Sequence, residues 1–328
     1  MVRRIAVRLA NAVVLIVAVV VLSYLLLYLA PGGPIAAIEG ASGAALSPQM
    51  QAQLTHQFGL DRPWYVQAAT WFVQVLQGNF GVSFYYSRPV TELVLGALSN
   101  TIVLALTAFV LSSVMGTVAG VIAAQKPRGA VSRGVTILAI AGYSAPPFWI
   151  AIILLVVFAS AIRVFPVSGM ASAIPPTGFL NQLGDLAAHL TLPAVTLTLA
   201  WVGTYARTAR ASMIEVMQSD YIRTAYAKGA SYLSVVFRHA LRNALLPVLT
   251  LAGMQVGTMV SGAILVETVF SWPGIGPLAL QGVSSRDTPL LVGIFVISSV
   301  AVIVANFVTD ALYSVVDPRI RVGATSSR

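Results

Sequence analysis

Long runs of apolar residues alternate with short polar stretches along this chain. A helix needs roughly 20 apolar residues to cross the hydrocarbon core of a bilayer. We therefore expect an all-α integral membrane protein with a single transmembrane domain and six transmembrane helices. The expected spans cover about residues 9–30, 99–124, 135–160, 191–211, 245–267 and 289–314.

The first apolar run, at 9–30, could be confused with a secretory signal peptide. It is longer than the apolar core of about 7–15 residues that such peptides carry, and no A-x-A cleavage pattern follows it. We therefore expect this run to be retained as the first span.

The composition agrees with a membrane protein. Hydrophobic residues make up 58% of the chain and charged residues only 9%, whereas ordinary soluble domains carry about a quarter charged residues. The chain has no cysteine, which excludes disulfides and thiolate metal sites. Its net charge of +9 would suit nucleic acid only if the basic residues formed one surface.

Lys and Arg are instead concentrated in alternate connections between the spans. With the N-terminus in the cytoplasm, fifteen of the nineteen basic residues fall on the cytoplasmic side. The other side holds Arg62, Arg88, Arg163 and Arg286. This asymmetry follows the positive-inside rule and places both termini in the cytoplasm. The positive charge thus reflects topology, and we expect no nucleic-acid partner.

The connection at 31–98 is expected to be an ordered extracytoplasmic loop. Ser47-Pro48 is typical of a helix N-cap followed by proline at the first helical position. From Pro63 to Gln77, aromatic and apolar residues recur at helical spacing with glutamines between them. An amphipathic helix with two tryptophans suits the membrane interface, and docking of an outer partner is the alternative.

A basic segment, Asp220–Pro247, interrupts the apolar runs, and most of it lies in the cytoplasmic connection at 212–244. Apolar residues at Tyr221, Ile222, Ala225, Tyr226 and Gly229 predict one apolar stripe on a helix of about two turns. Gly229 is placed to end this helix, because glycine adopts the left-handed conformation at little cost. A second helix is expected from Ser231, with one apolar side and one basic side, running towards the fifth span.

Two interpretations of the basic segment remain open from these patterns alone. A basic amphipathic helix binds anionic lipid headgroups without any protein partner. The same helix suits a groove on an ATP-driven subunit, with which it would move.

The basic segment resembles the cytoplasmic coupling segment, or EAA loop, of the peptide/nickel family of ABC importer permeases. The resemblance lies in the strings Asp220-Tyr221-Ile222-Arg223-Thr224-Ala225, Ala227-Lys228-Gly229 and Arg238-His239-Ala240-Leu241-Arg242-Asn243-Ala244-Leu245-Leu246-Pro247. The general pattern has Glu-Ala-Ala where this chain has Arg223-Thr224-Ala225, and its proline lies earlier. Both departures resemble the peptide subgroup.

Three further matches extend the resemblance over nearly the whole chain. They are Gly59-Leu60-Asp61-Arg62-Pro63 with Gly78-Asn79-Phe80-Gly81-Val82-Ser83, Glu267-Thr268-Val269-Phe270 with Pro273-Gly274-Ile275-Gly276, and Asp317-Pro318-Arg319. Asn79 replaces the family's usual Asp. The short N-terminal tail and long first outer loop are similar to the B-type member of a permease pair.

The resemblance implies a type I ABC importer permease fold with a cytoplasmic coupling helix, in a bacterial cytoplasmic membrane. The implied partners are a homologous second permease, two ATP-binding cassette subunits that bind ATP and Mg²⁺, an extracytoplasmic substrate-binding protein, and membrane lipids. The implied cargo is di- or oligopeptides, with nickel or another small solute as the alternative. The residues implied to couple to the ATPases are Asp220, Tyr221, Arg223, Thr224, Ala225, Lys228 and Gly229.

The sequence carries no enzymatic motif. It has no G-x-x-x-x-G-K-[ST] phosphate loop, no H-E-x-x-H and no G-x-S-x-G. We therefore expect no catalytic residue, no metal ligand and no cofactor on this chain. An ion-coupled secondary transporter, the rival from another class, predicts paired broken helices and carboxylates at mid-membrane; the sequence shows one broken helix and no carboxylate clearly at that depth.

Within the spans, small residues four apart predict close helix packing, inside the chain or between subunits. They are Gly116 and Gly120 in the second span and Gly253 and Gly257 in the fifth.

Other polar or irregular positions in the spans are candidates for a pathway or gate. Tyr143, Ser144, Pro146 and Pro147 mark a kink in the third span, where broken backbone needs protein or a water-filled cavity beside it. For the two prolines the alternative is plain kinking of the helix. Gln255 is a further candidate for the pathway, and the alternative for it is a hydrogen bond between helices. Asp310 is expected to pair with Arg207 or Arg210.

Overall fold

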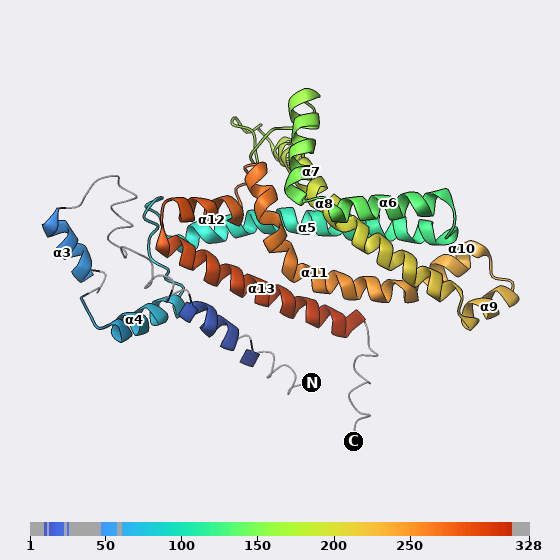
Figure 1. The fold of residues 1–328 in the computed structure, drawn as a ribbon, viewed down its shortest axis with the longest axis horizontal. Coiled ribbons are helices and arrows are strands. Elements are labelled where there is room, and N and C mark those ends of the chain that lie inside the picture. Colours follow the sequence, from blue (N-terminus) through green and yellow to red (C-terminus); the bar gives the residue numbers. More distant parts are fainter. Residues whose placement is uncertain (1–9, 12, 23–24, 26–46, 58–60, 317–328) are drawn as a thin grey trace, which may run out of the picture. The chain divides into compact units, whose positions relative to one another are not determined.

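The computed structural model describes residues 10–316 except 12, 23–24, 26–46 and 58–60 (Figure 1). The described residues are mostly helical, and their only β pairing is a single antiparallel bridge between Val82 and Pro89. The chain divides into two compact units, residues 1–101 with 273–304 and residues 102–272 with 305–328.

The first unit contains short helices and parts of two long helices. Its elements are α3 (Pro48–Gln57), α4 (Trp64–Leu76), the start of α5 (Val90–Gln125), α12 (Ile275–Ser284) and most of the described part of α13 (Thr288–Val316). One apolar core joins the start of α5 to α12 and α13, around Val90, Val94 and Leu290. A second core packs Val75 of α4 with Val20, Val292 and Val296.

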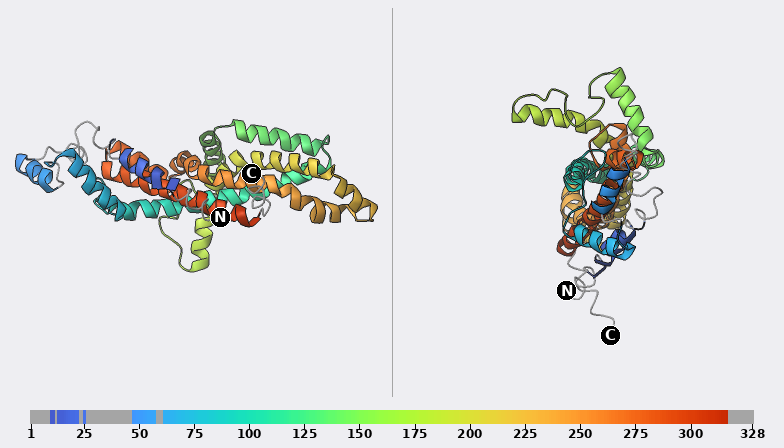
Figure 2. Two further views of the ribbon diagram at one scale, coloured as in Figure 1. Left: turned by 90° about the horizontal axis from the view of Figure 1, so that it is seen from below. Right: turned by 90° about the vertical axis from the view of Figure 1, so that its left-hand side faces the viewer.

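The second unit contains the remaining helices. They are the rest of α5, α6 (Ala130–Ser144), α7 (Pro147–Leu154), the π-helix η1 (Leu155–Ala161), α8 (Phe179–Met217), α9 (Asp220–Ala227), α10 (Tyr232–Ser234), the π-helix η2 (Val235–Ala240) and α11 (Leu241–Val269). Helix α8 is central, because it packs against α6, α7 and α11 (Figure 2).

Among the described residues, four helical stretches are long and apolar enough to cross a membrane. They are Val90–Gln125, Phe179–Met217, Tyr232–Gln255 and Thr288–Phe307. Each overlaps a predicted span, but α5 begins at Val90, nine positions before the predicted residue 99. Of the first predicted span, Val13–Leu22 is an apolar helix, and most of the rest of 9–30 lies outside the described residues.

The third predicted span is broken rather than kinked. Helices Ala130–Gly142 and Pro147–Ala161 meet at an angle of 103°. The break follows from the two prolines, which lack amide donors and disfavour helical geometry in the residue before them. Ala145 is accordingly extended, at φ −81° and ψ 131°, and Pro147 opens the next helix. Of the two alternatives, the structure therefore shows a broken helix and not plain kinking.

Helices α3 and α4 form where the local sequence signals predict them. The Ser47 hydroxyl accepts the amide of Met50 at 3.3 Å, which confirms the predicted N-cap of α3. Helix α4 has one buried apolar position, Val75, whereas Trp64 and Tyr65 are 62% and 60% exposed. The amphipathic pattern therefore places one end of α4 in a core and leaves its aromatic start on the surface.

Glycines allow α6 and α8 to approach closely. A Cβ atom added to Gly203 of α8 would lie 2.5 Å from the Ala139 carbonyl oxygen of α6. A Cβ atom on Gly142 would likewise meet the Leu199 carbonyl oxygen at 2.5 Å. Small residues at such crossings maximise van der Waals contact between helices in a membrane.

Replacing Gly203 with alanine is expected to lower the free energy of unfolding by about 1–3 kcal/mol, because the new methyl group overpacks the α6–α8 crossing. Gly134→Ala is the matched control on α6, where a Cβ atom meets nothing within 4 Å. There the better helix propensity of alanine is expected to raise stability. Unfolding temperatures of the detergent-purified variants provide the measurement, and equal values for both would contradict the packing argument.

Candidate coupling site

Helix α9 is a two-turn helix that is closed at its C-terminus by a Schellman motif. Gly229 has φ +80°, its amide donates to the Tyr226 carbonyl at 2.9 Å, and the Ala230 amide donates to the Ala225 carbonyl at 3.1 Å. A residue with a Cβ atom rarely adopts this conformation. The predicted helix end at Gly229 is confirmed.

One face of α9 is buried against neighbouring helices. Ile222 is 1% exposed and Ala225 is 9% exposed. They belong to an apolar cluster, the α9 cluster, whose other buried members come from α5, α8, η2 and α11: Val121, Ala124, Met213, Val235, Val236, Ala240 and Ala244. Helix α9 therefore packs directly on η2 and shares one apolar cluster with residues from α5, α8 and α11.

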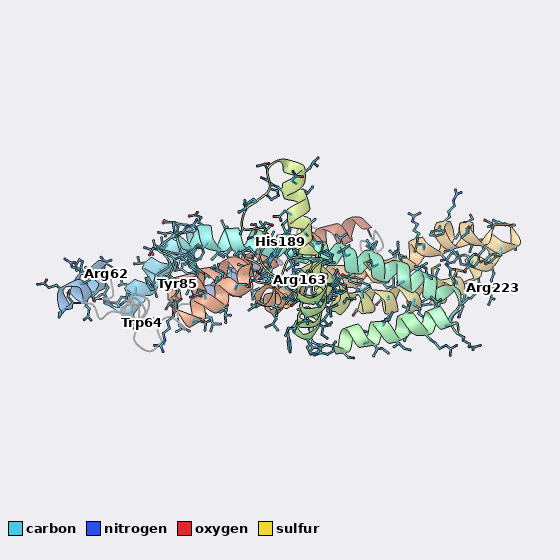
Figure 3. The ribbon with its side chains drawn as sticks, turned by 90° about the horizontal axis from the view of Figure 1, so that it is seen from above. Arg62, Trp64, Tyr85, Arg163, His189 and Arg223 are labelled. Carbon is cyan, nitrogen blue, oxygen red and sulfur yellow. The ribbon has the colours of Figure 1, made fainter. Side chains whose placement is uncertain are left out.

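The opposite face of α9 is open to solvent. Asp220, Arg223, Thr224 and Lys228 are exposed, and Arg223 is 3.5 Å from Asp220 (Figure 3). An ion pair this exposed contributes little to stability, so these charges remain available to other molecules.

The predicted apolar stripe divides into two parts. Only Ile222 and Ala225 are buried, whereas Tyr221 and Tyr226 are 43% and 40% exposed. The Tyr221 hydroxyl accepts a hydrogen bond from the Asn243 side-chain amide at 2.8 Å, which links α9 to α11. The predicted apolar stripe is therefore only partly buried, because a helix this short buries only the residues on its inner side.

The second helix of the basic segment begins as predicted, after Ser231, and continues through α10 and η2 into α11. Val235 and Val236 are buried in the α9 cluster, but Tyr232 and Phe237 are 44% and 62% exposed. On the predicted apolar side of this second helix, only part of the side chains is therefore buried.

One basic side chain next to this segment, Arg210, holds α8 to the first turn of α6 and to the connection before it. Arg210 Nε donates to the Ser132 hydroxyl at 2.8 Å, and its Nη2 donates to the Pro127 carbonyl at 3.1 Å. These bonds give Arg210 partners other than the predicted Asp310, whose side chain lies outside the described residues.

The candidate gate residues lie on α6, α7 and α11, of which α7 and α11 are in contact. Ser144 ends α6, Pro146 precedes α7 and Pro147 begins it, and Gln255 lies on α11, against which α7 packs. Of Tyr143 the structure describes the backbone alone.

The small residues of α5 contact α8 within the same unit. A Cβ atom on Gly116 would lie 2.6 Å from the Tyr205 Cβ, and one on Gly120 would lie 2.4 Å from the Ala206 carbonyl oxygen. Gly253 is half-buried on α11, and Gly257 lies further along the same helix with its surroundings outside the described residues. The geometry of the first pair is that of packing within one subunit.

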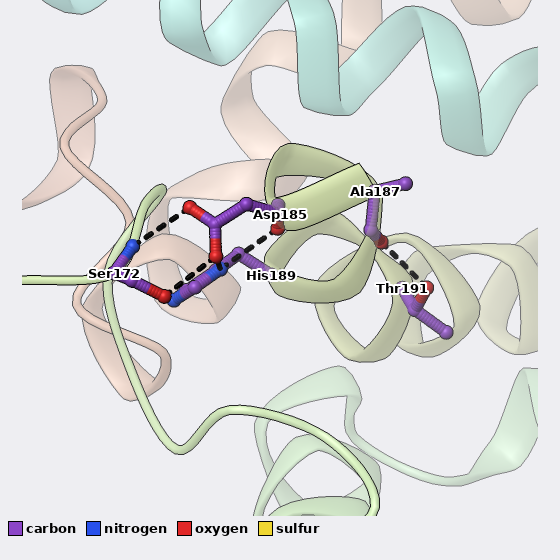
Figure 4. Close-up of polar contacts among 5 residues, drawn as sticks. All are labelled: Ser172, Asp185, Ala187, His189 and Thr191. Carbon is purple, nitrogen blue, oxygen red and sulfur yellow. Dashed lines mark hydrogen bonds and ion pairs between the residues drawn. The ribbon is translucent and has the colours of Figure 1, made fainter. Parts of the chain in front are cut away.

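Sequence reasoning missed a polar network at the start of α8 (Figure 4). The Ser172 hydroxyl and amide donate to the two Asp185 carboxylate oxygens at 2.6 and 2.9 Å. His189, only 7% exposed, places Nδ1 2.9 Å from the Asp185 carbonyl oxygen. The network ties the connection before α8 onto that helix, and the Asp185–His189 spacing of four was its only sequence signal.

A second missed network centres on Asp287, which is fully buried in the first unit. Its carboxylate accepts hydrogen bonds from the Ser83 hydroxyl and the amides of Tyr85 and Leu290. Partial burial raises the pKa of the neighbouring Tyr86 above its usual value, and the negative charges of Tyr85 and Asp287 raise it further.

Among the described residues, no group of three or more His, Asp or Glu side chains suits a metal ion.

Comparison with known proteins places this arrangement in a family. Residues 116–322 match the family described as binding-protein-dependent transport system inner membrane component, and residues 1–105 match the N-terminal part of such membrane components. The chain belongs to this family of transporter membrane components.

Several known proteins are similar in sequence to this chain over nearly its whole length. A di/tripeptide transport system permease of Pseudomonas aeruginosa is 40% identical, over 92% of this chain and 94% of its own. The oligopeptide permease AppB of Bacillus subtilis is 36% identical, over 93% and 95%. The dipeptide permease DppB of Escherichia coli K12 is also 36% identical, over 96% and 97%.

Solved structures support the same fold. The chain matches a structure of the inward-facing MetNI methionine ABC transporter with a TM-score of 0.55 at 17% identity. The match covers 69% of this chain and 97% of the other. The resemblance to ABC importer permeases is thereby confirmed, whereas the count of six spans stays a prediction.

Truncating Ile222 to alanine is expected to cost about 2–5 kcal/mol of packing energy in the α9 cluster. Because α9 makes its buried contacts through so few side chains, we expect faster amide hydrogen exchange at residues 219–230. Leu233→Ala is the control, since Leu233 lies on the same segment but is 65% exposed. Unchanged exchange in Ile222→Ala would show that α9 is held by other contacts.

Proposed function

We propose that this chain is one of two permease subunits of an ATP-driven importer of di- or oligopeptides. The observation that carries the proposal is its similarity, at 36–40% identity over more than nine-tenths of the chain, to permeases named for peptide transport. None of these three names refers to nickel, which favours peptides over the alternative cargo.

In this proposal α9 is the helix that receives motion from the ATPase subunits. The buried contacts of Ile222 and Ala225 support this role, since a helix held by the ends of long neighbours passes displacement on to them. The exposed residues Asp220, Tyr221, Arg223, Thr224 and Lys228 form the surface that would meet an ATPase subunit. Ala225 and Gly229 act indirectly, through packing and through the turn.

The energetics require ATP binding to discriminate between two states of the assembled transporter. A ligand shifts a conformational equilibrium only by its difference in affinity for the two states. ATP binding at the partner subunits would therefore favour the arrangement in which α9 is displaced, and the displacement would change access to the pathway.

The break between α6 and α7 is proposed as part of the pathway or its gate. The backbone leaves regular helix geometry at the break, around Tyr143, Ser144, Pro146 and Pro147, and irregular backbone at membrane depth needs protein or water beside it. Helix α7 packs against α8 and α11, so a shift of those helices would move the break. Gln255 of α11 would supply a polar group to the same pathway.

The proposed assembly has this chain beside a homologous permease in the cytoplasmic membrane, with both termini in the cytoplasm. Two ATPase subunits would bind ATP and Mg²⁺, and an extracytoplasmic binding protein would deliver the peptide. The distribution of fifteen basic residues on one side and four on the other supports this orientation.

The proposed cargo can be tested by reconstituting the complete transporter and its binding protein in proteoliposomes. We expect ATP-dependent accumulation of labelled di- to oligopeptides, and none of Ni²⁺. Accumulation of Ni²⁺ but no peptide would replace the proposed cargo with the alternative. Ion-gradient-driven uptake without ATP would overturn the ABC mechanism.

Replacing Gly229 with valine is expected to abolish substrate-stimulated ATP hydrolysis by the assembled complex, because a β-branched residue opposes φ +80° and disrupts the end of α9. Membrane insertion should persist, since Gly229 lies outside the apolar spans. Gly134→Val is the matched control, at a position with open space and ordinary φ. Normal stimulation in Gly229→Val would contradict the coupling role of α9.

A further inference from the structure

Residues 82–89 form a tight turn, here called the tyrosine turn. The Val82–Pro89 bridge closes it, the Ser83 amide donates to the Arg88 carbonyl at 3.0 Å, and the Ser87 amide donates to the Ser83 carbonyl at 3.0 Å. Tyr85 and Tyr86 lie at its tip. The turn therefore presents two aromatic side chains from a backbone fixed by hydrogen bonds.

The tyrosine turn is anchored by a buried carboxylate. Asp287 accepts hydrogen bonds from the Ser83 hydroxyl and, at 3.0 Å, from the Tyr85 amide, while the Ser83 hydroxyl accepts the Tyr86 amide at 3.0 Å. Both Asp287 and Ser83 are at most 1% exposed. Hydrogen bonds to a buried charge are strong and costly to break, so this anchor holds the turn in one conformation.

The two tyrosine rings are exposed although their backbone is held. Tyr85 is 51% exposed and Tyr86 37% exposed, and the rings meet edge to face with centroids 4.9 Å apart. Only the amide groups of these residues take part in the anchor. Removing a ring therefore leaves the hydrogen bonds of the turn intact.

The surroundings of the rings suit a protein partner better than lipid. Arg88 and Glu92 pair beside the turn, each 57% exposed, so a charged rim borders the aromatic centre. Interfaces between proteins combine such a rim with tyrosine, whose stiff side chain loses little entropy on binding. By contrast, Trp64 and Tyr65 begin an amphipathic helix, the usual arrangement of an interfacial anchor.

We propose that the tyrosine turn is a docking contact for the extracytoplasmic substrate-binding protein. This inference rests on the proposed function and orientation. A binding protein is the partner that the family description itself requires, and the turn belongs to the connection placed outside the membrane by the distribution of basic residues. The rings would insert into a shallow apolar depression on that protein, with Arg88 and Glu92 pairing at its margin.

Photo-cross-linking in cells that carry the complete transporter tests the contact directly. A benzoylphenylalanine at position 85 is expected to cross-link to an epitope-tagged copy of the transporter's own binding protein. The same residue at position 65, a tyrosine 60% exposed on α4, is the matched control and is expected to label lipid. Cross-links from position 85 to lipid or to the second permease alone would overturn the proposal.

A kinetic measurement separates this inference from the proposed function. With purified complex, Tyr85→Ala should raise the binding-protein concentration that half-maximally stimulates ATP hydrolysis by about thirty-fold, the size expected for loss of an interface hot spot. Saturating binding protein should restore the rate, and Tyr65→Ala should match the wild type. An unshifted curve for Tyr85→Ala contradicts the docking contact alone, whereas absence of stimulation in the wild type contradicts the proposed function.

Discussion

Burial of a very small apolar surface, Ile222 and Ala225 of α9, is the contact on which the candidate coupling site depends. These two side chains close the α9 cluster against residues from four other elements. A helix of eight residues has little stability of its own, so tertiary packing must hold it in place. The packing that stabilises α9 also gives it a direct mechanical connection to the long helices.

The long helices in turn depend on close backbone approach. In a bilayer, helices gain nothing by hiding apolar surface from lipid, so association relies on van der Waals contact and hydrogen bonds. Gly203, Gly116 and Gly120 bring α8 against α6 and α5, and Arg210 adds side-chain bonds at the same helix. Helix α8 is therefore the element through which a displacement of α9 would spread in its unit.

Much of the fold could be predicted from local patterns. The N-cap at Ser47, the helix end at Gly229 and the restart of the helix after Ser231 each depend on a few neighbouring residues. The start of α5 and the sharp break at Pro146 were less predictable. Helix α5 extends beyond its apolar run because its first turns pack on α12 and α13. The angle at the break depends on the packing of α7 against α8 and α11.

The sequence by itself determined the class of protein, its apolar spans and the basic segment, because hydropathy, charge placement and helix signals are properties of adjacent residues. Only the tertiary structure decided which side of α9 is buried and which of its tyrosines are exposed. It alone also joined Ser83 to Asp287, 204 positions away. Such a contact depends on how distant segments pack, and no local pattern of residues encodes it.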